Sequence, residues 1–469
     1  MPNIARSASC MLPLLALLCA CREERSWLAK SHASIALYES GRFEEALVPA
    51  EEGLKTARER FGPDDLRTAY ALDHAGKTLM RLGRLAEARP YLEEALAAKE
   101  RTLDPADPRR AYYLLELGEL EARLGAHDAA EGLYQRALEL YRGAYGEISL
   151  PSAMTHARLG ALYRDWGLHE EAERTLRRAE AINGRLEGLD PGVASAVDAS
   201  LCGIFAEDGR LGEAGGRCAK GLAGLRVALP PGHADIARAL SDEGLYLLRT
   251  GKPAAAREDL ERGMEVHLRH PGGDPLGYLS NRLAWAELLE AEGKSAEAEA
   301  ILDSALAHFE GSHAAVKALL RGAGFYARRR QEAMAETLYR SALLKHEESP
   351  MADRVDREAA WAGLIALYAR TGRRPVAERL LERAWEEQVQ FQGPRHRALA
   401  EALVACSAAS LKAGDRRTAR RDLERLERLL ATNFPSRDPF RVAASAEAAA
   451  LRARLGVPEE PRPASHRTF

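Results

Sequence analysis

The chain has 469 residues, 29% charged and 46% hydrophobic, and a formal net charge of −3. Because that length exceeds one ordinary hydrophobic core and the small net charge provides no basic stripe, we expect several domains or repeats and no nucleic-acid partner. Aromatic residues make up only 6%, and the abundance of Ala, Leu, Arg and Glu favours helix nearly everywhere.

The N-terminus carries an apolar run over residues 10–20. This run is too short to span a bilayer, which needs about 20 residues, but it suits the apolar region of a signal peptide. It ends in Leu18-Cys19-Ala20-Cys21, which resembles the signal of bacterial lipoproteins, although Cys19 stands where Ser or Ala is usual. The resemblance implies a signal segment over residues 1–21, cleavage before Cys21 and a lipid on its thiol, which would attach the protein to a membrane without spanning it.

Beyond this segment, one glycine recurs at a fixed spacing of 42 residues. The eighth copy is five residues shorter and has arginine in place of the glycine, after which the period returns. Such a period is typical of a solenoid built from two-helix repeats. We therefore predict ten repeats, each with one corner between its two helices, at Gly41, Gly83, Gly125, Gly167, Gly209, Gly251, Gly293, Arg330, Gly372 and Gly414.

Each copy repeats one packing pattern around its corner. Glycine suits a left-handed residue that ends the first helix and lets the second fold back. A bulky residue nine positions after the corner is expected to fill the space between one repeat and the next. A small residue five positions after the corner lets a neighbouring helix approach, and this residue is Ala46, Ala88, Ala130, Ala172, Ala214, Ala256, Ala298, Ala335, Ala377 or Ala419.

The third copy resembles the tetratricopeptide repeat in Leu117-Gly118, Gly125, Ala130, Tyr134 and Ala137, and residues 61–72 and 392–399 look like the linker of its kinesin-light-chain subtype. The resemblance implies an all-α fold, a right-handed superhelical solenoid of about ten helix–turn–helix repeats over residues 27–434. Residues 438–456 are predicted to form a capping helix, because solenoids cover their last face. The proline-rich residues 457–469 are predicted to be a disordered tail.

No arrangement of residues indicates catalysis, so we expect a protein that is not an enzyme and needs no cofactor. Gly293-Lys294-Ser295 looks like the end of a phosphate loop, but it lacks the earlier glycine and lies at a repeat corner. His267 and His270 have no further ligands at a convincing spacing, so no metal site is predicted.

Three cysteines remain beyond the N-terminal segment, and an odd number without close spacing is not a disulfide framework. Cys202 and Cys218 fall on the two helices of one repeat, where an oxidising compartment could join them. The alternative is that they, like Cys406, are small buried apolar residues.

The remaining candidate site is the groove lined by the first helix of each repeat. Resemblance to the family puts binding positions ten, six, three and two residues before the corner. Six before it there is no asparagine ladder, and several residues there are small, which suits a partner helix. Two before it stands a series of cations that could receive acidic side chains or a terminal carboxylate, or could be ordinary helix C-terminal cations: Arg81, Arg123, Arg249, Arg328, Arg370 and Lys412, interrupted by Asp165 and Glu207.

We therefore expect a non-enzymatic scaffold that binds an unknown protein or peptide in its concave groove. The resemblance of the N-terminus places it in a bacterial cell envelope, on the periplasmic side, where its only membrane contact is a lipid anchor. The alternative is a cytoplasmic regulatory or sensor subunit that acts with a separate kinase or protease. A third hypothesis is an enzyme whose site the sequence does not reveal.

Overall fold

The computed structural model describes residues 26–186, 190–230, 232–269, 274–310, 314–348, 354–389, 397–433 and 439–456. Every regular element in these ranges is a helix, so the predicted all-α fold is confirmed. None of the described helices is both long and apolar enough to cross a membrane. The predicted signal segment with Cys21 and the predicted tail lie outside the described residues, as does His270.

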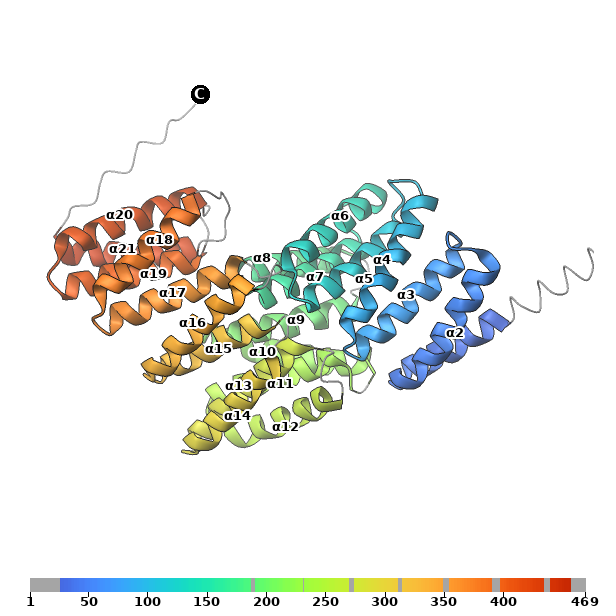
Figure 1. Cartoon of the computed structure of the whole chain (residues 1–469), viewed down its shortest axis with the longest axis horizontal. Coiled ribbons are helices and arrows are strands. Elements are labelled where there is room, and N and C mark those ends of the chain that lie inside the picture. Colours follow the sequence, from blue (N-terminus) through green and yellow to red (C-terminus); the bar gives the residue numbers. More distant parts are fainter. Residues whose placement is uncertain are drawn as a thin grey trace, which may run out of the picture. The chain divides into compact units, whose positions relative to one another are not determined.

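The chain forms two compact units, one up to Ile301 and one from Leu302 onwards, and the division falls within α14 (Figure 1). Unit 1 begins with a helix over residues 26–39. It continues with α2 (Phe43–Phe61), α3 (Leu66–Arg81), α4 (Leu85–Thr102), α5 (Arg109–Arg123), α6 (His127–Tyr145), α7 (Leu150–Trp166), α8 (His169–Arg185), α9 (Pro191–Glu207), α10 (Leu211–Ala228), α11 (Ala234–Arg249), α12 (Pro253–Arg269), α13 (Pro275–Ala291) and α14 (Ser295–Phe309).

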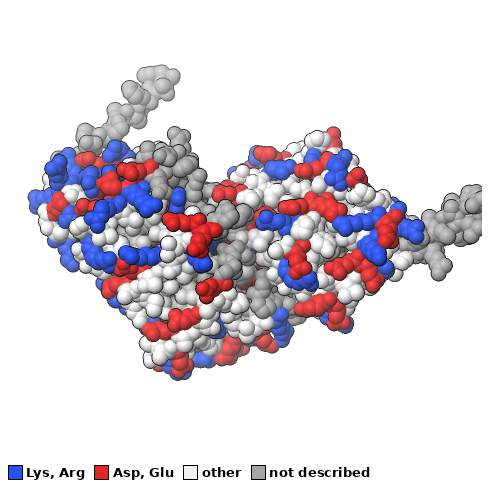
Figure 2. All heavy atoms as spheres, viewed as in Figure 1, with Lys and Arg blue, Asp and Glu red and all other residues white. Residues whose placement is uncertain are grey.

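Unit 2 has the same kind of paired helices. They are α15 (Ala315–Arg328), α16 (Glu332–Glu348), α17 (Arg354–Arg370), α18 (Arg374–Val389), α19 (Arg397–Lys412), α20 (Arg416–Asn433) and α21 (Pro439–Leu455). The last helix packs on both α19 and α20 and lies where the capping helix was predicted. On the face shown in Figure 2, cationic and anionic side chains are interspersed, as expected for a chain whose net charge is only −3.

The corners explain why glycine recurs between paired helices. All nine corner glycines have φ between 75° and 85°, the left-handed region that costs an ordinary residue free energy. A Cβ atom added at seven of them would meet no atom within 4 Å, so the backbone conformation alone selects glycine at Gly41, Gly167, Gly209, Gly251, Gly293, Gly372 and Gly414. Arg330 adopts the same conformation with φ of 63°, and it is the only non-glycine described residue with positive φ.

In four pairs of unit 1, a glycine on the first helix receives a bulky side chain from the second. A Cβ atom added to Gly118 would lie 2.6 Å from Cε1 of Tyr134, and one added to Gly76 would lie 2.9 Å from Leu92. In these pairs the bulky residue nine positions after the corner fills the space within its own pair, whereas the sequence pattern suggested the space between repeats. Tyr339 of the eighth copy does lie between repeats, against Gly363 of the next pair. The alanine five positions after each corner is buried, with at most 1% of its surface exposed.

The first helices of successive pairs pack against one another. In unit 1, α3 contacts α5, α7 contacts α9, and α11 contacts both α9 and α13. These helices therefore form a continuous inner wall, while the second helices lie outside it. The wall curves so far that Tyr38 and Lys77 line the same hollow as Leu229, although Leu229 lies about four repeats further along the sequence.

We expect Arg330→Gly to stabilise unit 2 by about 1 kcal/mol, because the left-handed conformation costs an arginine roughly 1–2 kcal/mol and glycine adds some chain entropy to the unfolded state. The Arg330 side chain is exposed, so its removal sacrifices little packing. The midpoint of urea unfolding, followed by circular dichroism, measures the change. Gly372→Arg, at the next corner, is the matched reverse substitution and should destabilise by a similar amount; an Arg330→Gly midpoint at or below that of the wild type would contradict the argument.

Candidate functional site

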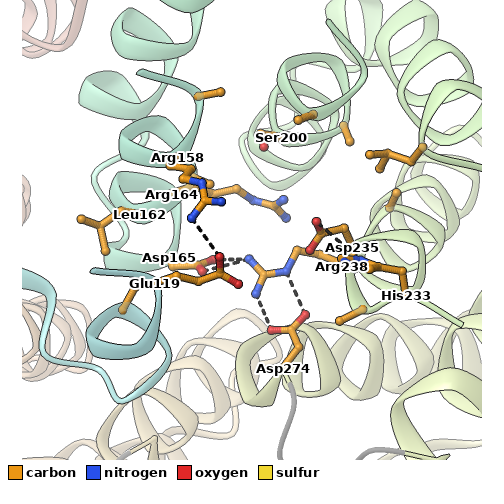
Figure 3. A pocket seen from close by; sticks show the side chains of 18 of the residues that line it. Glu119, Arg158, Leu162, Arg164, Asp165, Ser200, His233, Asp235, Arg238 and Asp274 are labelled. Atoms are coloured by element: carbon orange, nitrogen blue, oxygen red, sulfur yellow. Dashed lines mark hydrogen bonds and ion pairs between the residues drawn. The ribbon is translucent and has the colours of Figure 1, made fainter. Parts of the chain in front are cut away.

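The inner wall of unit 1 encloses a cavity of about 440 Å³ (Figure 3). We call it the inner cavity. It is lined by α3, α5, α7, α9 and α11 and by the loop before α11. Arg81 and His233 both line it, although they are far apart in the sequence. A neighbouring hollow of about 610 Å³ shares Arg81, Arg123, Arg158 and His233 with it. The two hollows thus form one concave surface on which residues from repeats distant in sequence meet.

One part of the inner cavity is apolar and is lined largely by small side chains. Ala157, Ala161, Ala196 and Ala199 line it from α7 and α9, together with larger residues such as Leu225. Small residues on the first helices therefore leave room on the inner wall, which agrees with the sequence pattern of small residues six positions before some corners.

The other part of the inner cavity is charged, and most of its cations already have partners. Arg123 lies 2.6 Å from the carboxylate of Glu119, and Arg158 donates to the same carboxylate at 3.0 Å. Burial alone would raise the pKa of Glu119, but Arg123 and Arg158 lower it well below its usual range, so the carboxylate stays ionised. Figure 3 shows Arg238 in the same way between Asp165 and Asp274.

Arg81 differs from these arginines. Its Nε donates to the hydroxyl of Tyr38 at 2.9 Å, and the guanidinium forms no ion pair with any described residue. Burial by itself lowers the pKa of Arg81, but Tyr38 and Glu119 raise it above its ordinary value, so the side chain is charged. Since it lines both hollows, Arg81 offers hydrogen-bond donors to a ligand on the concave surface.

Of the six cations predicted for the concave wall, the structure brings only Arg81 and Arg123 together. Arg249 donates to the backbone oxygens of Ala206 and Glu207 at the end of α9 and forms an ion pair of 3.5 Å with Glu287. It is absent from the lining of the inner cavity and of its neighbour. Arg249 therefore neutralises the C-terminal carbonyls of the preceding first helix, not those of its own.

The remaining three cations lie in unit 2. Arg370 repeats the role of Arg249, because it donates to the backbone oxygen of Ala327 at 3.3 Å, near the end of α15. Arg328 and Lys412 are exposed at the ends of α15 and α19. Their role as partner-binding residues stays a prediction.

Sequence reasoning missed the charged residues that lie deeper in the inner cavity, namely Arg158, Arg164, Arg238, Asp242 and Asp274. The available signal was the interruption of the cation series by acids. Asp165 is paired with Arg238 at 2.6 Å, and Glu207 lies 3.4 Å from Arg164. Asp165 and Glu207 interrupt the series of cations two residues before the corners, and each of them pairs with an arginine from another part of the inner wall.

No cluster of three or more potential metal ligands occurs within the described ranges. His267 is 4% exposed, and burial lowers the pKa of its imidazole, which makes it a buried neutral side chain beside Asp274. Cys202 and Cys218 are joined by a disulfide between α9 and α10, and Cys406 is a buried free thiol.

A partly buried chain of polar contacts runs beside the cavity from α3 to α7. The hydroxyl of Tyr112 donates to Asp73 at 2.9 Å and accepts from Lys77 at 2.9 Å. Lys77 lies 3.6 Å from Glu116, which Arg158 approaches at 3.3 Å. The second oxygen of Asp73, Oδ1, is buried without a hydrogen bond. Burial raises the pKa of Asp73 to about 7, against the charge of Lys77 and with a smaller contribution from Glu116.

We expect the wild type to lose stability as the pH rises from about 4 to about 7, and we expect Asp73→Asn not to show this loss. Because the folded-state pKa exceeds the unfolded one, the folded protein binds the extra proton in this window, and its advantage disappears as the carboxyl ionises. The difference between the two proteins should change by up to about 4 kcal/mol. Urea unfolding at pH 4 and pH 8 measures it; parallel pH profiles of the two proteins would refute a raised pKa at Asp73.

Part of the sequence matches a known protein family. Residues 27–101 and 108–183 match the family model described as tetratricopeptide repeat. Among solved structures, the chain is similar to BtubC (BKLC) from P. vanneervenii, with 21% identity, a TM-score of 0.38, and coverage of 49% of this chain and 92% of that one. It is also similar to a Podosopora anserina putative kinesin light chain with nearly identical TPR-like repeats, with 20% identity, a TM-score of 0.32, and coverage of 44% and 97%.

No curated protein matches the sequence. The family match covers the first helix pairs of unit 1, which contribute α3, α5 and α7 to the inner cavity. The later pairs of both units continue the same helix–corner–helix arrangement. Residues 27–101 and 108–183 therefore carry the sequence pattern of tetratricopeptide repeats.

Proposed function

We propose that this protein is a non-enzymatic scaffold that binds a segment of a partner protein in the inner cavity of unit 1. Tetratricopeptide repeats generally mediate contacts between proteins, and solenoids present their concave surfaces to partners. The observation that carries the proposal is Arg81, a charged side chain on the concave surface whose only described hydrogen bond goes to Tyr38. The other arginines of the cavity are already paired with acids of the same chain.

The cavity specifies the chemistry of the segment that it binds. An acidic side chain or a terminal carboxylate would form charge-assisted hydrogen bonds with Arg81. An apolar side chain of the same segment would lie against Ala157, Ala161 and Ala196, where it would be removed from water. A segment that combines an acidic group with an apolar side chain therefore fits both parts of the cavity.

The proposed location is a bacterial cell envelope, with a lipid on Cys21 as the membrane anchor. Two features support it. The sequence Leu18-Cys19-Ala20-Cys21 follows an apolar run of signal-peptide length. The bond between Cys202 and Cys218 belongs to the kind of crosslink that persists in oxidising compartments such as the periplasm.

Arg81→Gln should weaken partner binding about 10- to 100-fold, because a hydrogen bond to a charged group contributes about 1.5–3 kcal/mol. A photo-crosslinking residue at Ala161, which lines the cavity, identifies the partner in intact cells. Calorimetric titration of the purified partner segment then compares wild type and variant.

Arg136→Gln is the matched control. Arg136 lies on α6 outside the cavity, its side chain is 56% exposed, and it pairs with Glu100 at 3.0 Å. Its loss should leave the affinity within about twofold, because exposed ion pairs contribute little. Equal affinities for wild type and Arg81→Gln would move the binding site away from the inner cavity.

Cys21→Ser tests the anchor separately. We expect the substitution to abolish incorporation of labelled palmitate and to shift the protein from the membrane fraction to the soluble fraction, since the thiol is the proposed site of lipid attachment. Cys406→Ser, at a buried thiol, is the control and should leave both unchanged. Labelling that persists without Cys21 would exclude the lipoprotein hypothesis.

A further inference from the structure

We propose that Arg164 is a positioning residue that clamps α7 to α11 across the intervening α9 and thereby fixes the width of the inner cavity. Arg164 lies on α7, and its guanidinium donates twice to Asp242 on α11, at 2.8 and 2.5 Å. The two side chains are 6% and 3% exposed. This proposal rests on the proposed function, because it names what holds that binding site in shape.

The clamp depends on a missing side chain in α9. Arg164 crosses α9 at Gly203, where an added Cβ atom would lie 2.2 Å from Cζ of the guanidinium. No side chain fits between them, so any residue other than glycine would push the guanidinium away from Asp242. The sequence showed Gly203 only as one of the small residues six positions before a corner.

A second ion pair links the same two helices in the opposite direction. Arg238 on α11 reaches back to Asp165 on α7, at 2.6 and 2.9 Å. Arg238 also bonds to Asp274, whose carboxylate accepts from the backbone N–H of Gly277 and caps α13. Two opposed arginines therefore hold α7 and α11, which belong to alternate repeats and are separated by more than 70 residues in sequence.

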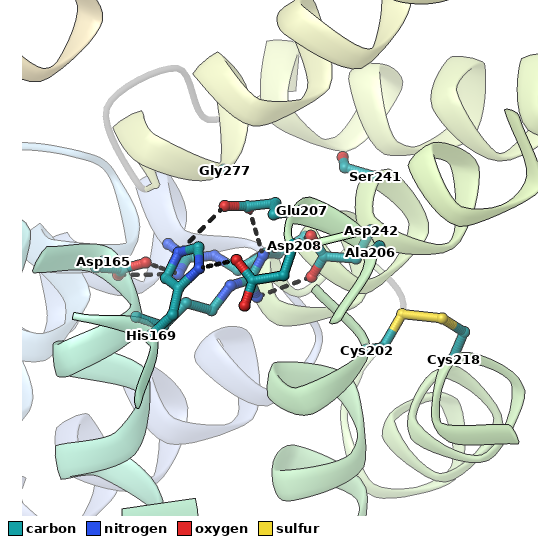
Figure 4. A network of polar contacts seen from close by, with 12 residues as sticks. Asp165, His169, Cys202, Ala206, Glu207, Asp208, Cys218, Ser241, Asp242 and Gly277 are labelled. Carbon is teal, nitrogen blue, oxygen red and sulfur yellow. Dashed lines mark hydrogen bonds and ion pairs between the residues drawn. A yellow bond between two sulfur atoms is a disulfide. The ribbon is translucent and has the colours of Figure 1, made fainter. Parts of the chain in front are cut away.

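The network extends to the end of α9, where Figure 4 shows His169 beside Glu207 and Asp208. Arg164 lies 3.4 Å from Glu207, and His169 contacts both Glu207, at 3.5 Å, and Asp208, at 2.7 Å. In the same repeat, the disulfide from Cys202, next to Gly203, ties α9 to α10. The helix under the clamp is thus held at its C-terminal end and on its outer side.

The clamp lies between the two sides of the cavity. From α7 the inner wall runs back through α5 to Arg81 on α3, and the N-terminal end of α11 carries His233 and Asp235. A change in the angle between α7 and α11 would therefore alter the separation of Arg81 from His233. Because Asp242 is buried, loss of its partner leaves an uncompensated buried carboxylate, which favours a different packing of these helices.

The test measures the width of the concave surface, at the neighbouring hollow, without any partner. Glu39 and Val227 both line the neighbouring hollow. Nitroxide side chains introduced there as encoded amino acids report the width of this hollow in the full chain by pulsed electron–electron double resonance. Gly203→Ala should broaden the distance distribution and shift its mean. Gly216→Ala is the matched control, because it lies on α10 of the same repeat and its added Cβ would meet no atom within 4 Å.

Asp242→Asn is the second variant, which keeps the shape of the side chain and removes its charge. It should broaden the distribution as Gly203→Ala does, and it decides the question if Gly203→Ala does not fold. Distributions of wild-type width and mean in Asp242→Asn, or in a folded Gly203→Ala, would overturn the clamp. Since no partner is present, this result is independent of the affinity measured for Arg81→Gln, so failure of the clamp and failure of the binding proposal are distinguishable.

Discussion

In four repeats of unit 1, the close approach of the two helices depends on a glycine that has no side chain to place between them. Gly118 admits the ring of Tyr134, and Gly76, Gly160 and Gly244 admit leucines from their own second helices. Each of these pairs can therefore close tightly on one large side chain. The pairs stack with their first helices in contact, and this stacking creates the inner wall that carries Arg81, Arg123 and the ion pairs of unit 1.

Burial determines which charged side chains of that inner wall must be paired. A cation removed from water is stable only beside an acid or several hydrogen-bond acceptors. Arg158, Arg164 and Arg238 meet this requirement with acids on neighbouring or alternate repeats. Arg81 meets it only in part, through Tyr38, and this difference distinguishes a residue available to a partner from residues that stabilise the wall.

The sequence predicted the helix pairs and their corners because both depend on local properties: the period, the small residues and the φ that glycine permits. The prediction of Arg81 and Arg123 on the concave wall came instead from resemblance to the repeat family, and both residues line the inner cavity. The sequence could not predict Arg249 and Arg370 as caps of a preceding helix, because that contact depends on the offset between stacked pairs. The pairing of Arg164 with Asp242 depends on the curvature of the whole stack, which no single repeat encodes.

Arg330 shows what a corner tolerates. Its side chain is exposed, and seven of the corner glycines likewise have no atom within 4 Å of an added Cβ. The restriction at a corner is therefore on the backbone alone, and a residue of any size can occupy it at the cost of one left-handed conformation. Corners are consequently suitable attachment points for dyes, affinity tags or tethers spaced one repeat apart, with no disturbance of the inner wall on which binding would be measured.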